Sequence, residues 1–200
     1  VMVSVRRATL DDLEAMVGAY TAAWREGFRY MFSASVFADH AFDDERREEC
    51  HDAVLGDDCD TYVVEVCDRV VGFAVARASA ERAIDLDDIW MLPSAWGSGA
   101  AAALVTRIEE DLRASGGGEV IAWIPEDSPS GRRFFDKLGW RPTGTVEWLA
   151  LYPEQPNRLF EYGHRVACSG SHCTPATPVT PWPSVGSGWP HRGGPRRCRP

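Results

Sequence analysis

The chain has 200 residues, a length that suits one domain, with 44% hydrophobic and 26% charged residues, as in an ordinary soluble globular protein. Charge is uneven along it: before residue 167, 17 basic residues stand against 30 acidic ones, a net charge of −13, whereas the segment after it carries +4 from four arginines. Because an acidic domain repels a phosphate backbone, nucleic acid is excluded as an expected partner. Apolar runs stay well short of the roughly 18 residues that cross a membrane, so no membrane partner is expected.

The cysteines indicate a reducing compartment. Cys50, Cys59 and Cys67 lack the paired spacing of metal ligands, and the first residues favour a strand and an acidic helix over a signal sequence. We therefore expect free or buried thiols and a cytoplasmic protein. The later cysteines, with His172, match no common zinc module, so no metal is expected.

A change of composition divides the chain into a domain, residues 1–166, and a tail, residues 167–200. The tail is dense in Pro, Gly, Ser and Thr and has no hydrophobic periodicity. Such a segment buries too little apolar surface to offset its ordering entropy, which predicts disorder. Whether the tail is a natural extension or unselected read-through stays open.

Strand and helix patterns alternate through the domain. Thr9 and Asp12 form a capping box at the start of the first helix, and Asp68–Arg69 gives a hairpin signal. In chain order we expect a strand at 3–8, helices at 9–27 and 43–55, strands at 61–67, 70–77 and 84–92, a helix at 100–114, a strand at 120–124, a helix at 128–138, and strands at 140–151 and 158–166. This order predicts an α/β (mixed α+β) fold with a central sheet and helices on both faces.

The segment from residue 85 to residue 104 has a clear chemical signature. A strand ends at Pro93, turns through Gly97 and Gly99, and enters a helix rich in small residues. Glycines at a strand-to-helix turn let backbone amides converge beside the positive end of the helix dipole, which makes a site for phosphate. The third glycine of the dinucleotide fingerprint and the Gly-Lys-Ser/Thr of a P-loop are both missing. A tight structural turn remains the alternative.

Together with a later motif, this segment resembles the GNAT acetyltransferases over nearly all of residues 3–166. Trp96, Gly99 and Ala101 lie at the defined positions of the family's (Gln/Arg)-x-x-Gly-x-(Gly/Ala). A second run, Phe134-Phe135 followed by Gly139-Trp140, resembles the family's Phe-Tyr-x-x-x-Gly-Phe. The resemblance implies a GNAT fold with a mixed, largely antiparallel sheet of about seven strands, and a homodimer through the late strands.

The resemblance also implies acetyl-CoA as co-substrate. The amides of six consecutive residues would hold its pyrophosphate: Trp96, Gly97, Ser98, Gly99, Ala100 and Ala101. The backbone of Met91 and Leu92 would pair with the pantetheine arm, and the Met91 amide would polarise the thioester carbonyl. Ser128 and Phe135 complete the expected cofactor-binding set.

Three positions depart from the family pattern. Trp96 replaces the usual Gln or Arg, and Ser128 replaces a common Asn. Phe135 stands where a tyrosine commonly protonates the departing thiolate, and phenylalanine has no proton to give. Tyr152, Tyr162 or water are the candidate replacements, or the thiolate leaves unaided, since a thiol pKa of about 8.5 makes it a tolerable leaving group.

The acceptor amine must be neutral before it attacks, which requires a base. Alternation predicts that Asp85, Asp87, Ile89 and Met91 share one face of a strand. The resemblance favours Asp85, six residues before Met91, as the base, with Asp87 second; solvated carboxylates at the start of a strand are the alternative.

Aromatic residues could line the acceptor side. Trp24, Phe28 and Tyr30 are candidates for an apolar slot, or for the core, and Trp148 and Tyr152 are weaker candidates. The acidic charge suits a cationic amine on a small molecule or a peptide. The leading hypothesis is direct acetyl transfer, because no cysteine or serine sits in a recognisable nucleophile setting. A catalytically weak acyl-CoA-binding module on the same fold is the alternative.

Overall fold

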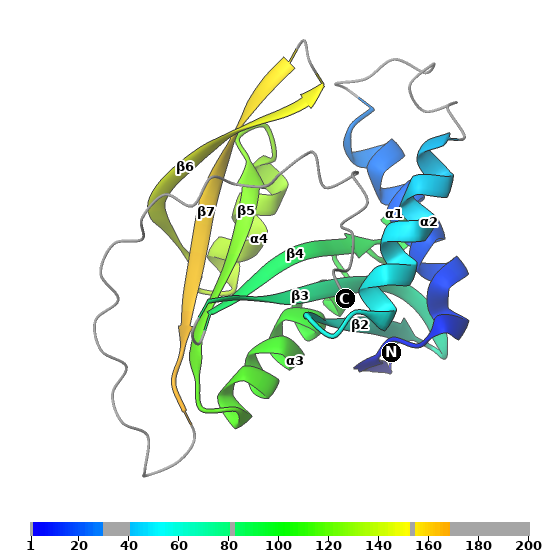
Figure 1. Ribbon diagram of the computed structural model, residues 1–200, viewed down its shortest axis with the longest axis horizontal. Coiled ribbons are helices and arrows are strands. Elements are labelled where there is room, and N and C mark those ends of the chain that lie inside the picture. Colours follow the sequence, from blue (N-terminus) through cyan, green and yellow to red (C-terminus); the bar gives the residue numbers. More distant parts are fainter. Residues whose placement is uncertain (1, 30–40, 81–82, 153–154, 169–200) are drawn as a thin grey trace, which may run out of the picture.

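A computed structural model describes residues 2–29, 41–80, 83–152 and 155–168 (Figure 1). Within them the chain forms seven strands and four α-helices. In order these are β1 (Val3–Arg7), α1 (Leu13–Gly27), α2 (Ala41–Leu55), β2 (Cys59–Val66), β3 (Arg69–Ala80), β4 (Ala83–Met91), α3 (Ala100–Ala114), β5 (Gly118–Pro125), α4 (Pro129–Lys137), β6 (Arg141–Tyr152) and β7 (Gln155–Val166). None of the helices in these ranges is long and apolar enough to cross a membrane.

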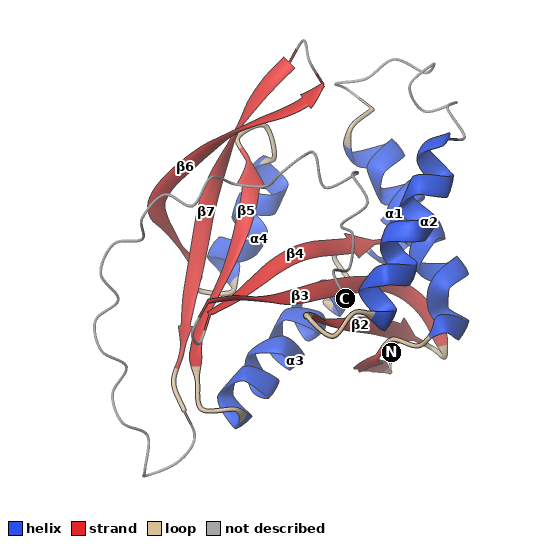
Figure 2. Cartoon of the chain, in the orientation of Figure 1, coloured by secondary structure: helices blue, strands red, loops and turns tan. Residues whose placement is uncertain are grey.

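All seven strands form one sheet in the order β1-β2-β3-β4-β5-β7-β6 (Figure 2). Only β4 and β5 pair in parallel; every other neighbouring pair is antiparallel. The mixed, largely antiparallel sheet predicted from the sequence is therefore confirmed.

Each face of the sheet has its own apolar core. On one face, α1 and α2 bury Met16, Tyr20 and Cys50 against Val63 and Phe73. On the other, α3 packs mainly against β1, β2 and β3 and α4 packs against β5, and their buried residues include Leu104, Ile108, Leu112 and Phe135. The spacing of the α3 residues gives one apolar stripe at helical periodicity, which fixes that helix on the sheet.

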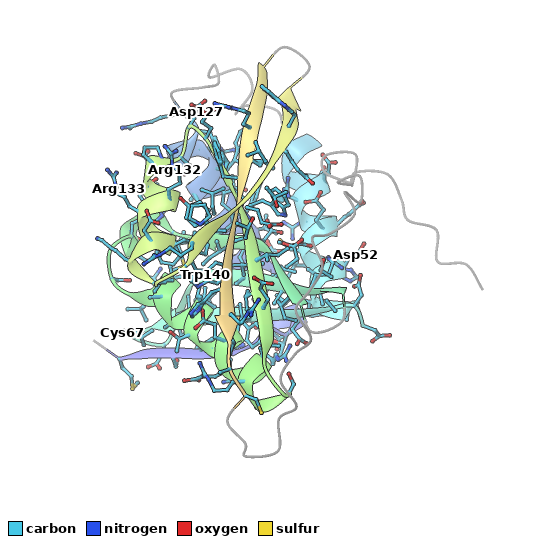
Figure 3. The ribbon with its side chains drawn as sticks, turned by 90° about the vertical axis from the view of Figure 1, so that its left-hand side faces the viewer. Asp52, Cys67, Asp127, Arg132, Arg133 and Trp140 are labelled. Atoms are coloured by element: carbon cyan, nitrogen blue, oxygen red, sulfur yellow. The ribbon has the colours of Figure 1, made fainter. Side chains whose placement is uncertain are left out.

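The second sequence motif turns out to end a helix. Gly139 follows α4 with φ of 85°, a conformation that favours glycine, and its N–H donates to Asp136 O at 3.1 Å. The Trp140 N–H donates to Phe135 O at 3.1 Å, and their rings pack with centroids 4.8 Å apart. This is a Schellman motif with its hydrophobic contact. Trp140, labelled in Figure 3, is fully buried, and its indole donates to Glu109 on α3 at 2.9 Å.

The turns and the helix cap predicted in the N-terminal half are present, with small shifts in position. The capping box of Thr9 and Asp12 is present, although it begins a short 3₁₀ turn, Leu10–Asp12, before α1. The β2–β3 hairpin exists, but its two turn residues are Cys67 and Asp68, with φ of 50° and 60°, so the predicted turn was one residue late. Cys50, Cys59 and Cys67 are free thiols, as expected. Of the predicted tail, only Ala167 and Cys168 fall within the described residues.

One prediction about β4 is wrong. Val75 pairs with Asp88 and Ala76 pairs with Leu86, which leaves Asp87 as the extra residue of a β-bulge. The bulge shifts the alternation of side chains, so Leu86 and Met91 enter the same core against α3. Asp85 therefore points to the opposite face from Met91, toward α1 and α2, and does not share a face with it.

Candidate acyl-CoA site

The sheet opens between β4 and β5. Their parallel pairing covers only residues 83–85 of β4 and 119–121 of β5, although β4 continues to Met91 and β5 to Pro125. The two strands separate beyond this point (Figure 1), while β5 stays paired with β7 along its whole length. Beyond residue 85, the edge of β4 that faces β5 is therefore not paired with that strand, so it can offer backbone groups to a ligand that carries amides.

Met91 presents its backbone to this gap. The N–H of Leu92 donates to Val71 O at 2.7 Å, so Leu92 occupies a hydrogen-bonded position opposite β3. In an antiparallel ladder such positions alternate, so Met91, opposite Gly72, directs its N–H and C=O away from β3 and toward β5. The prediction that the Leu92 backbone pairs with the pantetheine arm needs correction. Its N–H donates to Val71 O, and its carbonyl accepts from the Ala95 N–H at 2.8 Å.

Gly72 lets Met91 lie close to β3. A Cβ on Gly72 would stand 2.5 Å from Trp90 O and 2.8 Å from Met91 Cε, and closer still to Met91 Sδ. The Met91 side chain thus fills the space that a side chain at position 72 would need. An isolated glycine inside a strand is a known sign of such close approach, and it was the available signal in the sequence.

The glycine turn predicted from the sequence connects β4 to α3. Gly97 and Gly99 have φ of 76° and 89°, which lets the chain fold back tightly before Ala100. The first α-helical hydrogen bond runs from Ala103 N to Gly99 O at 3.0 Å, so the preceding amides lie at the open end of a 15-residue helix. Ser98 Oγ accepts a long hydrogen bond from Ala100 N at 3.3 Å. Converging amides and the helix dipole suit a phosphate group at this turn.

Trp96 bridges the turn and the strand. Its indole Nε1 donates to Met91 O at 3.0 Å, while 51% of the residue surface stays exposed. Tryptophan at this position departs from the family pattern, and the sequence carries no signal for where the indole lies.

The three carboxylates of β4 have different surroundings. Asp87, only 9% exposed in its side chain, accepts from Arg77 Nε at 2.6 Å, and Arg77 also pairs with Asp58. One oxygen of Asp87 is therefore already engaged, which leaves less of this carboxylate to accept a proton from an amine. Asp85 lies opposite Arg77 in the ladder, and its role as the base stays a prediction.

Asp88 was not among the site residues predicted from the sequence. It lies on the α1–α2 face and accepts from the Trp90 indole at 2.7 Å, and burial raises the pKa of its carboxyl. It lines a small cavity with Tyr20, Arg46 and Glu49, where burial also raises the pKa of Glu49. Regular alternation from Trp90 places Asp88 on this face, whereas the bulge at Asp87 changes the face of Asp85 and Leu86.

Residues proposed as acid and as acceptor contacts are scattered. Phe135 is 2% exposed and packs against Trp140, with the Tyr162 ring 6.4 Å away on β7. Tyr162 is 5% exposed in the same core. The side chain of Tyr152 and all of Tyr30 lie outside the described residues.

Two of the predicted acceptor aromatics belong to the α1 side. Trp24 is buried in the α1–α2 core with Phe28 beside it, ring centroids 6.0 Å apart, which agrees with the core alternative for Trp24. Trp148 on β6 is 68% exposed. Ser128 is the N-cap of α4: its Oγ accepts from Gly131 N at 3.3 Å.

Comparison with known proteins identifies the family. Residues 18–140 match the sequence profile of the Acetyltransferase (GNAT) family. Proteins of Mycobacterium tuberculosis and Mycobacterium bovis, each described as an uncharacterized N-acetyltransferase, are 30% identical over 77 residues, 38% of this chain. The match spans about half, 49%, of those relatives.

Solved structures share the fold. The PaiA N-acetyltransferase of Thermoplasma acidophilum, in complex with coenzyme A, is 14% identical with a TM-score of 0.64, covering 80% of this chain and 98% of that one. An N-acetyltransferase of Staphylococcus aureus is 19% identical with a TM-score of 0.64, covering 83% of this chain and 99% of that one. Because the family profile covers more than half of the sequence, the chain belongs to the GNAT acetyltransferase family.

Proposed function

We propose that the protein is an N-acetyltransferase that moves an acetyl group from acetyl-CoA directly to a primary amine of a small molecule or a peptide. The observation that carries the proposal is the opening between β4 and β5, which leads from Met91 to a glycine turn and the start of α3. Membership of the GNAT family supports acetyl transfer in general, and the nature of the acceptor is our inference.

The residues around this opening fit the two chemical parts of acetyl-CoA. Of the six predicted amides, those of Gly97, Gly99 and Ala101 are the candidates to receive the pyrophosphate. The N–H groups of Trp96 and Ser98 already donate to Pro93 O and Ala95 O, each at 3.2 Å, and that of Ala100 donates to Ser98 Oγ, so these three would have to exchange partners. The Met91 backbone, directed into the gap, would pair with the pantetheine arm and donate its N–H to the thioester oxygen. This site supplies no lysine or arginine from the turn itself, so binding depends on amide geometry.

The proposed reaction passes through the gap from one face to the other. The glycine turn belongs to the α3 side, whereas Asp85 points to the α1–α2 side, so the acceptor would approach opposite the coenzyme. A neutral amine nitrogen attacks the thioester carbonyl carbon, the C–N bond forms and the C–S bond breaks. Asp85 would take the amine proton only through water, because it lies about 17–20 Å from Met91 along β4. The thiolate leaves with or without a proton from Tyr152, Tyr162 or water.

Two acceptor-side assignments remain proposals. The acidic charge of the domain suits a cationic amine, and exposed Trp148 offers an apolar surface on β6. A homodimer through the late strands is also proposed, because β6 is an edge strand of the sheet.

Phe135 favours one competing function. With no phenol at this position and with Tyr162 buried, a protein that binds acyl-CoA but turns over slowly is the second candidate. The discriminating experiment measures acetyl-CoA binding and amine-dependent thiol release on the same preparation.

Thermal unfolding with and without acetyl-CoA tests binding. At 100 times its dissociation constant, a ligand adds about 2.7 kcal/mol, which raises Tm by about 5–10 °C for a chain of this length. Thiol release against a panel of amines then tests transfer, with Asp85→Asn as the variant and Asp44→Asn, an exposed acid on α2, as the matched control. Stabilisation without release on any amine favours the binding module, and absence of stabilisation contradicts the acyl-CoA assignment.

A further inference from the structure

Trp96 places a hydrogen-bond donor inside the opening between β4 and β5. The Met91 carbonyl points toward β5, and the Trp96 Nε1 lies 3.0 Å from that oxygen. A donor at this distance from an oxygen on the β5-facing edge of β4 lies beside that edge. The indole is a large rigid ring, so it occupies part of the path that an amide-bearing arm would follow along β4.

The contact uses a backbone group that such an arm needs. The Met91 N–H and C=O form the pair that β4 presents to the gap, and the indole takes the carbonyl. Indole nitrogen has one proton and can only donate, so it pairs with the same acceptor that an incoming amide N–H would use. The arm and the ring therefore compete for one oxygen and for the space beside it.

Trp96 is also free to leave without disturbing the fold. Half of its surface is exposed, and it belongs to neither apolar core, whereas its neighbour Ala95 packs on the α3 core. Rotation of one side chain in the turn would break the hydrogen bond and leave the cores intact. The cost of displacing it is thus close to the net worth of one neutral hydrogen bond plus its partial burial.

We propose that Trp96 is an intramolecular competitor of the acyl-CoA arm, which must displace the indole from the Met91 carbonyl to bind. The inference rests on the proposed acyl-CoA function and adds a residue that sets coenzyme affinity. It predicts that the protein binds acetyl-CoA more weakly than its open site would allow, and that Trp96 lowers affinity for the arm while leaving the turn's affinity for phosphate unchanged.

Two variants of the full chain and two ligands test this by isothermal titration. Trp96→Phe keeps a ring but removes the donor, and Trp96→Ala removes both. Acetyl-CoA carries the arm, whereas 3′-phospho-ADP is the same coenzyme without it. We expect Trp96→Phe to tighten acetyl-CoA binding by about two- to tenfold, the range of one neutral hydrogen bond, and Trp96→Ala to tighten it at least as much. The dissociation constant of 3′-phospho-ADP should change less than twofold in Trp96→Phe.

A spectroscopic measurement checks the displacement itself. In a ¹H–¹⁵N spectrum the Trp96 indole peak is the one missing from Trp96→Phe. Acetyl-CoA should shift this peak and speed its exchange with water, and 3′-phospho-ADP should leave both unchanged.

Three results would overturn the proposal. Weaker acetyl-CoA binding by Trp96→Phe would mean that the indole helps to bind the arm. An equal change in affinity for both ligands would mean that Trp96 acts on phosphate binding at the turn. An unchanged dissociation constant for acetyl-CoA would mean that the indole has no role in binding. If neither ligand binds the wild-type protein or either variant, the proposed function fails as well. Binding of acetyl-CoA by the variants alone would be the strongest support for the competitor.

Discussion

Gly72 offers a sharp test of how β3 positions the proposed arm-binding strand. In Gly72→Ala, the added Cβ would lie 2.5 Å from Trp90 O and 2.8 Å from Met91 Cε. The Met91 side chain has other rotamers, but the Trp90 carbonyl belongs to the backbone of the neighbouring strand and moves only if β4 moves. The substitution therefore pushes apart the two strands at Met91.

The magnitude follows from two opposing effects. Overpacking of a well-packed site typically costs about 1–3 kcal/mol. Alanine also restricts the unfolded chain, which returns about 0.4–1 kcal/mol. We expect a net loss of about 1–2 kcal/mol in the free energy of unfolding, a fall in Tm of about 3–6 °C at this chain length. Acetyl-CoA affinity should fall as well, because Met91 carries the backbone groups directed into the gap.

Denaturant unfolding with Gly18→Ala as the matched control measures this effect. Gly18 is exposed within α1, and a Cβ there meets nothing within 4 Å. The same substitution should therefore stabilise the protein by about 0.5–1 kcal/mol, since glycine is a poor helix former. The double variant Gly72→Ala/Met91→Val should recover part of the lost free energy of unfolding, because the shorter side chain no longer meets the added Cβ. The contact with the Trp90 carbonyl remains and should account for the rest of the loss. A Gly72→Ala protein as stable as the wild type would refute the close approach.

Three further substitutions probe local energetics through Tm. Burial raises the pKa of Asp88, so ionisation of this carboxyl disfavours the folded state. The Asp88→Asn variant should therefore be as stable as the wild type below about pH 4 and become progressively more stable than it as pH rises through the folded pKa. The asparagine amide oxygen can still accept the hydrogen bond from the Trp90 indole. A hydrogen bond from Arg6 lowers the pKa of Asp12, so the ionised carboxylate stabilises the folded state above its unfolded pKa, and this stabilisation is lost in acid. Asp12→Asn should lower the free energy of unfolding by about 1–2 kcal/mol at pH 7, and the difference from the wild type should narrow below about pH 4. A difference that does not depend on pH would contradict this. Ser128→Ala removes the α4 cap and should cost about 1 kcal/mol, whereas an unchanged Tm would show that the cap contributes nothing.

Elements with strong local signals were predicted closely. The helix expected at 100–114 matches α3 because its apolar stripe and its glycine boundaries are both written in the local sequence. The β2–β3 turn was one residue late because Cys67 and Asp68 adopt positive φ without glycine, so the usual signal for a tight hairpin is weak.

The bulge in β4 shows what local patterns could not supply. Residues Asp85 to Asp88 alternate acidic and apolar side chains only in part, and nothing in that run tells which residue the ladder will skip. The skipped residue is set by how Val75 and Ala76 of β3 align, which is a long-range property of the sheet. One extra residue reverses the face of every side chain beyond it, so the predicted common face for Asp85 and Met91 was lost.

The two family motifs carry different kinds of information. The second motif ends α4 and packs it on the core through Phe135, Gly139 and Trp140. This structural role requires two aromatic rings and one residue with positive φ, but no hydroxyl group. Replacement of the usual tyrosine by Phe135 therefore preserves the packing at the end of α4 and removes only a proton donor. The glycine turn, by contrast, has open space around Gly97 and Gly99, whose positive φ values let the chain fold back before α3. If the proposed acyl-CoA site is right, binding and proton donation depend on different residues, and this combination of motifs predicts a protein that binds the coenzyme and takes the proton donor from elsewhere.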